Sequence, residues 1–258
     1  MLRTTTLALA ALLFSNLATA APKQFGNAFV LVEIFTSEGC SSCPKADNYA
    51  NALVRQARTQ KLPLYVLAWH VDYWNKLKTA HGAWADPFSS PESTKRQSRY
   101  VKTLSVGGAK AGRIGTPQIL VDGRYPHKLG KGGNSVVIQG RINRERKAGI
   151  AITRTGTGVD WVVKEVEEEG CEILIALVQR GIKQKVGAGE NYGRELEHEN
   201  VVRWHTIVKL DKNQATGKTR IELPKGVPSD AADIIAVVQK RKDMAVLAAS
   251  LINWESKK

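Results

Sequence analysis

Cysteine is scarce in this sequence, since the 258 residues contain three, at Cys40, Cys43 and Cys171. A second Cys-x-x-Cys pair is absent, which excludes a structural zinc site built from two such pairs. Low-complexity segments are absent too, and the 43% hydrophobic and 24% charged residues are typical of a folded globular protein. A chain of this length is expected to form one large domain or two modest ones.

Long hydrophobic runs are also lacking. Arg3 precedes an apolar run from Leu7 to Phe14, which is too short to span a membrane, and small residues then lead to Ala20. This pattern is typical of a secretory signal peptide, so we predict a leader over residues 1–20. The mature protein is therefore expected to be periplasmic or secreted, with no membrane span. A lipid anchor is disfavoured because no cysteine lies near the predicted cleavage site.

Acidic residues are outnumbered by basic ones, and the formal net charge is +14. The lysines and arginines are scattered, and no aromatic-studded RNA-binding motif accompanies them. We interpret the charge as a solvated basic surface and expect no nucleic-acid partner. Weak attraction to anionic cell-surface material is the functional alternative.

The segment from Val30 to Lys45 carries the strongest chemical signal. An apolar run ends in a Ser-Glu-Gly turn, and Cys40-Ser-Ser-Cys43 then opens a predicted helix. Unpaired N–H groups and the positive end of the helix dipole favour a thiolate there. One helical turn brings the two sulfurs together, so a reversible disulfide is expected. We predict that Cys40, nearest the solvent, attacks and that Cys43 resolves the mixed disulfide. A purely structural disulfide is the alternative.

The third cysteine begins the segment CEILIALVQ, whose apolar and β-branched residues predict a strand. We expect Cys171 to be a buried, inert thiol. An intermolecular or regulatory bond through Cys171 is the alternative.

The first half of the chain alternates predicted strands and helices. A right-handed crossover makes the first two strands parallel, so their C-terminal ends lie at one edge of the sheet. Cys40 follows the first of these strands, and His70 and Asp72 end the second. Ligands collect at such an edge, so we predict His70 and Asp72 as accessory residues. A satisfied structural histidine is the alternative for His70. The expected elements are strand 27–36, helix 44–60, strand 62–70, a helix beginning at 90–91, a strand opening at 116–117 and helix 135–147.

A βαβ unit with Cys-x-x-Cys at its first helix, followed by Thr116-Pro117 opening a later strand, resembles the thioredoxin superfamily. The motifs EIFTSEGCSSCPKAD, WHVDYW, DPFSSP and TPQILVDGR are more narrowly similar to a bacterial exported family of unknown function with a thioredoxin-like core. GENYGRELEHENVVR, over residues 189–203, extends the resemblance into the second half. The resemblance implies a cis peptide bond at Pro117 that faces the disulfide and exposes the Thr116 backbone to an incoming chain.

Past Gly149 the sequence changes to short alternating segments separated by turn residues, which predict antiparallel strands. The expected fold class is therefore an α/β thioredoxin-like domain over residues 27–148, followed by a β-rich sandwich-like domain over residues 150–254. The charged region 187–200 is predicted as a long hairpin loop. In the functional alternative, Arg194 or His198 of this loop reaches across the interdomain cleft toward the disulfide.

Three functions are compatible with these residues. The leading hypothesis is an exported thiol–disulfide redox protein without a cofactor, in which Cys40, Cys43, Thr116 and Pro117 act on thiols or disulfides of exported partners. The first alternative is a copper-binding or metal-delivery protein with Cys40, Cys43 and His70 as ligands, because soft thiolates and imidazole suit copper. The second is a binding module in which the disulfide only staples a turn. The sequence identifies neither the partner, the direction of electron flow nor the oligomeric state.

Overall fold

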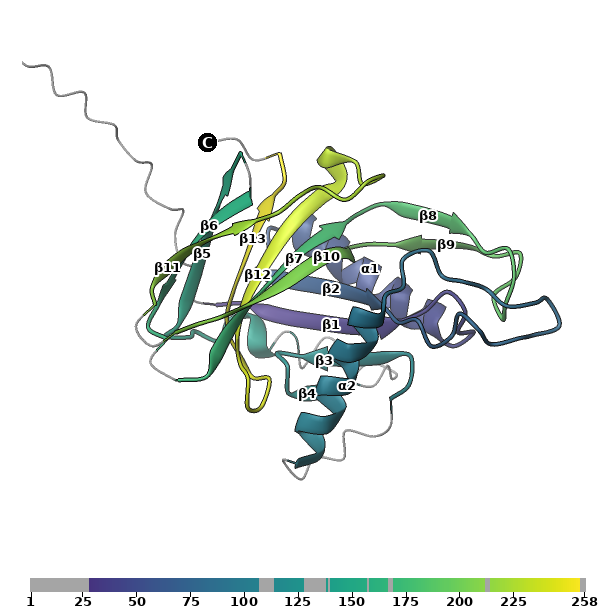
Figure 1. Cartoon of the computed structure of the whole chain (residues 1–258), viewed down its shortest axis with the longest axis horizontal. Helices are drawn as coiled ribbons and strands as arrows, with labels where there is room; N and C mark the ends of the chain where they lie inside the picture. Colours follow the sequence, from purple (N-terminus) through teal and green to yellow (C-terminus); the bar gives the residue numbers. More distant parts are fainter. Residues whose placement is uncertain are drawn as a thin grey trace, which may run out of the picture.

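The computed structural model describes residues 28–106, 114–127, 138, 140–156, 158–166, 169–211 and 214–255. This part of the chain contains thirteen strands, the α-helices α1 and α2, and a short 3-10 helix, η1 (Ser229–Ala231) (Figure 1). Residues 138 and 140–142, within the helix predicted over 135–147, are helical as well. The predicted leader over residues 1–20 and the first residues of the helix predicted over 135–147 lie outside the described residues. Within the described ranges, no helix is long and apolar enough to cross a membrane.

The centre of the molecule is an eight-stranded mixed sheet with the order β13-β12-β7-β10-β2-β1-β3-β4. β1 and β2 are parallel, as predicted, and Thr36 lies opposite His70 at their C-terminal ends. β3 runs antiparallel to β1 and forms a hairpin with β4. The strands of this sheet are β1 (Val30–Thr36), β2 (Leu64–His70), β3 (Gln118–Val121), β4 (Tyr125–His127), β7 (Cys171–Gln179), β10 (Val201–Lys209), β12 (Ala232–Lys240) and β13 (Val246–Asn253).

The two helices, α1 (Cys43–Thr59) and α2 (Pro91–Val106), cover opposite faces of the sheet (Figure 1). Pro44 lies in the first turn of α1, where its missing N–H removes no helical hydrogen bond. Residues at helical spacing form the apolar face of each helix. The apolar face of α1 consists of Ala46, Ala50, Leu53 and Val54, as predicted, and packs on the β1 residues Val30, Val32 and Ile34. On the other face of the sheet, Tyr100 and Leu104 of α2 pack in the cluster that contains Leu31, Phe35 and Trp69.

A second, three-stranded sheet packs on the central one through an apolar cluster. It consists of β5 (Gly149–Thr155), β6 (Gly158–Lys164) and β11 (Thr216–Arg220), in the order β11-β6-β5. The buried Trp161 ring belongs to this cluster, together with apolar residues of β7 and β12. A two-stranded ribbon of β8 (Ile182–Lys185) and β9 (Glu195–His198) projects beyond the central sheet (Figure 1).

The expected fold class, an α/β thioredoxin-like domain followed by a β-rich sandwich-like domain, is wrong. β7, β10, β12 and β13 do not form a separate sandwich but continue the sheet of β1 and β2. The junction lies where Val201 of β10 pairs in parallel with Ala68 of β2, whose N–H donates to the Asn200 carbonyl (3.0 Å). Alternation of apolar and polar residues predicts that a segment is a strand, but not which strand it pairs with. The domain limits 27–148 and 150–254 stay predictions, although one sheet contains strands from both segments.

Candidate functional site

Cys40 and Cys43 form a disulfide at the start of α1, with their Cα atoms 5.4 Å apart. The turn after β1 is closed by two backbone hydrogen bonds, from the Cys40 N–H to the Ser37 carbonyl and from the Cys43 N–H to the Cys40 carbonyl (3.2 and 3.1 Å). Both cysteines are fully buried, whereas Ser41 and Ser42 between them are exposed. The expectation that Cys40 lies nearest the solvent is therefore wrong, because packing of the chain buries Cys40 as completely as Cys43.

Trp74 connects the disulfide turn to the Thr116–Pro117 segment. A Cβ atom added at Gly39 would lie 3.1 Å from the Trp74 Cβ, so the tryptophan lies against the residue that precedes Cys40. The Trp74 indole N–H also donates to the Thr116 hydroxyl (2.8 Å). The Thr116–Pro117 peptide bond is cis, as expected. The structure thus places this segment beside the disulfide turn, through Trp74.

The loop between β8 and β9 holds the disulfide turn from the second half of the chain. The buried Asn191 amide donates to the backbone carbonyls of Glu38 and Cys40 (2.8 and 2.9 Å). Arg194 donates to the Asn191 side-chain carbonyl (2.9 Å), so this predicted residue reaches the turn indirectly and is itself exposed. Glu190 accepts a hydrogen bond from the Ser41 N–H (2.8 Å).

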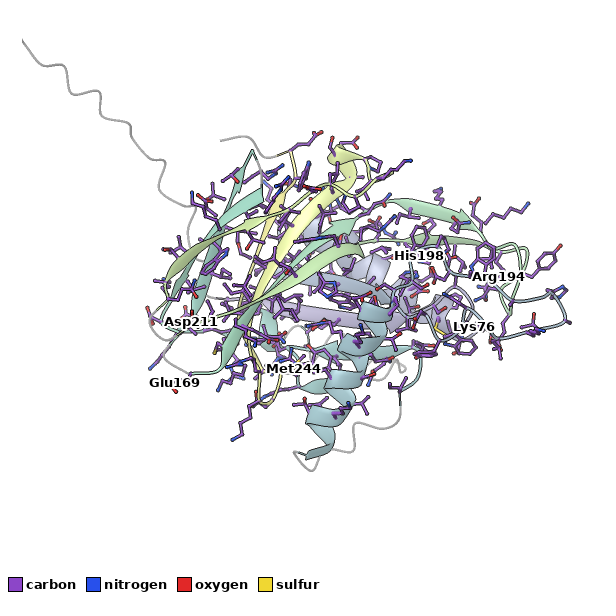
Figure 2. The ribbon with its side chains drawn as sticks, viewed as in Figure 1. Lys76, Glu169, Arg194, His198, Asp211 and Met244 are labelled. Carbon is purple, nitrogen blue, oxygen red and sulfur yellow. A yellow bond between two sulfur atoms is a disulfide. The ribbon has the colours of Figure 1, made fainter. Side chains whose placement is uncertain are left out.

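Glu38 is a buried carboxylate two residues before Cys40 and was not among the predicted site residues. Its side chain accepts a hydrogen bond from the Trp84 indole (2.8 Å) and pairs with His198 Nε2 (3.0 Å). His198, a predicted accessory residue, therefore contacts the turn through Glu38. In Figure 2, His198 and Arg194 lie at the end of the molecule that carries the disulfide.

His70, at the end of β2, forms a buried pair with Asp86 (Nδ1 to Oδ2, 2.7 Å). The same Asp86 oxygen accepts a hydrogen bond from the Glu38 N–H (2.9 Å), and the His70 and His198 rings meet edge to face with centroids 4.9 Å apart. Burial opposes a charged imidazole, but the Asp86 carboxylate outweighs it and raises the pKa of His70. Burial likewise opposes ionisation of Asp86, but His70 and the hydrogen bonds lower its pKa.

Asp72, the other predicted accessory residue, does not join this cluster. Its carboxylate accepts a hydrogen bond from the Thr94 hydroxyl (2.6 Å), and its N–H donates to the same hydroxyl (3.2 Å). Thr94 lies in the first turns of α2. Asp72 therefore connects the end of β2 to α2.

Asp47 lies one helical turn after Cys43 on α1, so the two side chains share a helix face. It is buried, and burial raises the pKa of its carboxyl group, although the nearby His198 and His70 act in the opposite direction. Asp47 Oδ2 and His70 Nε2 have no hydrogen-bond partner among the described residues. Two buried groups that can exchange protons therefore lie near each other, and Asp47 lies one helical turn from Cys43.

The copper alternative receives no support from this geometry. In the described ranges, no group of three or more His, Cys, Asp or Glu side chains is arranged to hold a metal ion. The Nδ1 of His70 is engaged by Asp86, and its ring lies against His198 and Phe88.

Four members of the site were not predicted from the sequence, because their partners lie far away along the chain. A signal was present for each of them. Glu38 directly precedes the cysteine motif, Asp86 lies in DPFSSP, and Glu190 and Asn191 lie in the charged region that was interpreted as a solvated loop. Cys171 is buried at the start of β7, as predicted.

Comparison with known proteins identifies the fold and the family. The structure is similar to a crystal structure of a protein from Agrobacterium tumefaciens, with a TM-score of 0.65 and 22% sequence identity, over 90% of this chain and 98% of that chain. Among proteins with curated functions, none matches. The family model described as "Protein of unknown function (DUF1223)" matches residues 31–239. This range includes every residue named above for the candidate site. The sequence motifs predicted a family of unknown function, and that part of the prediction is confirmed, whereas the thioredoxin-like core is not. Because this match spans most of the sequence, the chain belongs to the DUF1223 family.

Proposed function

We propose that this protein is an exported thiol–disulfide redox protein whose Cys40–Cys43 pair exchanges with thiols or disulfides of exported partners. The observation that carries the proposal is the position of the disulfide, at the start of α1 and next to a buried cluster of carboxylates and imidazoles. That cluster consists of Glu38, Asp47, His70, Asp86 and His198.

The chemistry follows from these positions. A partner thiolate attacks the Cys40 sulfur, the bond to Cys43 breaks, and Cys43 leaves as a thiolate. Asp47, on the same helix face, can give its proton to the Cys43 sulfur, while the Ser42 hydroxyl lies 3.4 Å from the Cys40 sulfur. The second thiolate of the partner then attacks the partner sulfur that is bound to Cys40, so Cys40 leaves as a thiolate and the partner is released as a disulfide. In the reverse direction, the Cys40 thiolate attacks a partner disulfide, and Cys43 displaces the partner sulfur from Cys40. Both electrons pass between the protein pair and the partner sulfurs.

Burial of both cysteines favours a second candidate, a binding module in which the disulfide staples the turn. Under the redox proposal, Trp74 and the loop that carries Asn191 have to move before a partner sulfur reaches Cys40. Under the binding-module proposal, the disulfide stays closed throughout the life of the protein.

Trapping of mixed disulfides distinguishes the two candidates. Cys43→Ser removes the resolving sulfur, so Cys40 should retain its partners as covalent complexes in the native compartment. The double variant Cys40→Ser/Cys43→Ser keeps Cys171 and controls for capture through that thiol. Complexes that need Cys40 support the redox proposal. If the single and double variants capture the same species, or none, the binding module is preferred.

A further inference from the structure

Glu190 is an exposed carboxylate from the second half of the chain that contacts the first backbone N–H after Cys40. Its Oε2 accepts a hydrogen bond from the Ser41 N–H at 2.8 Å. The Ser41 hydroxyl and N–H together hold the pKa of Glu190 below its usual range, so the group is ionised at neutral pH. A negative charge therefore lies at the start of α1, beside the disulfide.

The N–H groups that follow Cys40 are the ones that would stabilise its thiolate after reduction. Three backbone N–H groups lie at residues 41–43. The N–H of Ser41 donates to Glu190, and the N–H of Cys43 donates to the Cys40 carbonyl. The carboxylate thus takes a donor from the thiolate and adds a like charge next to it. Both effects make the reduced pair less favourable than it would be at an unoccupied helix start.

We propose that Glu190 tunes the redox equilibrium of the Cys40–Cys43 pair, favouring the disulfide and making the reduced protein a better electron donor. This inference rests on the proposed redox function and adds a direction to it. The Cys40 thiolate attacks a partner disulfide, and the Cys43 sulfur then displaces the partner sulfur from Cys40. The partner leaves as a dithiol with two electrons and two protons, and the protein returns to its disulfide. A dithiol electron donor then has to reduce the protein again.

The other charged groups around the pair do not reverse this effect. Glu38 is held by Trp84 and His198, and the charge of Asp86 is balanced by His70. Asp47 lies one turn further along α1, and Arg194 donates to the Asn191 side-chain carbonyl. Glu190 is the carboxylate in direct contact with the N–H that follows Cys40, and it is also the one whose exposure makes substitution structurally mild.

The Glu190→Gln variant tests this inference, because glutamine removes the negative charge but keeps an oxygen that can accept the hydrogen bond from the Ser41 N–H. The equilibrium constant for reduction of the disulfide by dithiothreitol should rise about two- to fivefold at low ionic strength, the size of a helix-terminus charge effect. In the Cys43→Ser background, the Cys40 thiolate absorbance should appear at lower pH. Both differences should shrink in high salt, because an exposed charge is screened.

Glu195→Gln is the matched control, because it removes an exposed carboxylate from the neighbouring strand β9. An unchanged equilibrium constant and titration in Glu190→Gln, or changes no larger than those of Glu195→Gln, would overturn the inference. These measurements use dithiothreitol and no protein partner. Failure to trap a partner therefore counts against the proposed function alone, and failure of the Glu190 effect counts against this inference alone.

Discussion

The Asn191 side-chain amide donates a hydrogen bond to the backbone carbonyl of Cys40 at 2.9 Å, although 151 positions separate the two residues in sequence. The same amide nitrogen donates to the Glu38 carbonyl at 2.8 Å. One side chain therefore satisfies two carbonyls of the turn that leads into the disulfide. Because Asn191 is buried, no solvent replaces it at this position.

Asn191→Ala should loosen the disulfide turn. Loss of the amide removes the donor of the buried Glu38 carbonyl and leaves the Cys40 carbonyl with the Cys43 N–H alone, so the free energy of unfolding should fall by about 2 kcal/mol. The disulfide should also be reduced faster by a small phosphine, because its cover opens more often. Urea denaturation and the reduction rate are the measurements. Gln184→Ala on β8 is the control and should change stability by less than about 0.5 kcal/mol. Equal reduction rates in Asn191→Ala and the wild type would contradict this prediction.

Asp86→Asn should destabilise the protein strongly. The substitution removes the partner of the buried His70, and breaking a buried pair costs roughly 3–5 kcal/mol. Chemical denaturation at pH 6 measures the loss. The matched control is Glu197→Gln, which breaks the exposed pair with Lys183 and should cost less than about 1 kcal/mol. Similar losses in both variants would show that the His70–Asp86 pair is not a main support of the site.

The same pair predicts a pH window of stability. The pKa of His70 is raised above its ordinary 6.5, so its contribution is complete below pH 6.5 and is lost as the pH rises through the folded value. The pKa of Asp86 is lowered from 3.8, so its contribution is present above that value and is lost as the pH falls through the folded one. The contribution of the His70–Asp86 pair to stability should therefore be highest between pH 3.8 and pH 6.5. The melting temperature of His70→Gln, measured against pH, should not show the decline above pH 6.5 that is expected of the wild type. The same decline in both proteins would show that His70 is not its cause.

Asp47→Asn should remove a loss of stability that the wild type shows as the pH rises. Burial raises the pKa of Asp47, so the unfolded chain loses this proton first, and the wild type loses stability as the pH rises from 3.8 through the folded value. Asparagine does not ionise, so the variant should be the more stable protein at neutral pH and match the wild type below pH 3.8. Melting temperatures across this range test the prediction. Asp72→Asn, outside the cluster, is the control.

Gly217→Ala should destabilise the packing of the smaller sheet. A Cβ atom at this position would lie 2.1 Å from the ring of the buried Trp161, so either the ring or the strand has to shift. Overpacking of this kind costs about 1–3 kcal/mol. Gly156→Ala is the control, because a Cβ there meets nothing within 4 Å. A fully stable Gly217→Ala protein would mean that the Trp161 ring adapts without loss.

Local features of the site were readable from the sequence because their causes are local. The two-residue spacing of Cys40 and Cys43 predicts a disulfide at a helix start, and the structure has one. The X-Pro bond at Pro117 was expected to be cis and is cis. The strand predicted over 171–179 has the same limits in the structure. The disulfide turn and the strand depend on close spacing and on helix and strand periodicity, whereas the cis bond was implied by the resemblance to the thioredoxin superfamily.

The sequence by itself determined most of the strands, the helices α1 and α2, the family of unknown function and the disulfide turn, because backbone preference, periodicity and close spacing act over a few residues. It did not predict β8, β9 or β13. Only the tertiary structure decided that β10 continues the sheet beside β2, that Asn191 donates to the Cys40 carbonyl, and that Glu38 pairs with His198. These contacts join residues far apart along the chain. Their formation depends on which apolar faces and buried polar groups find partners when the whole chain packs, and no local pattern contains that information.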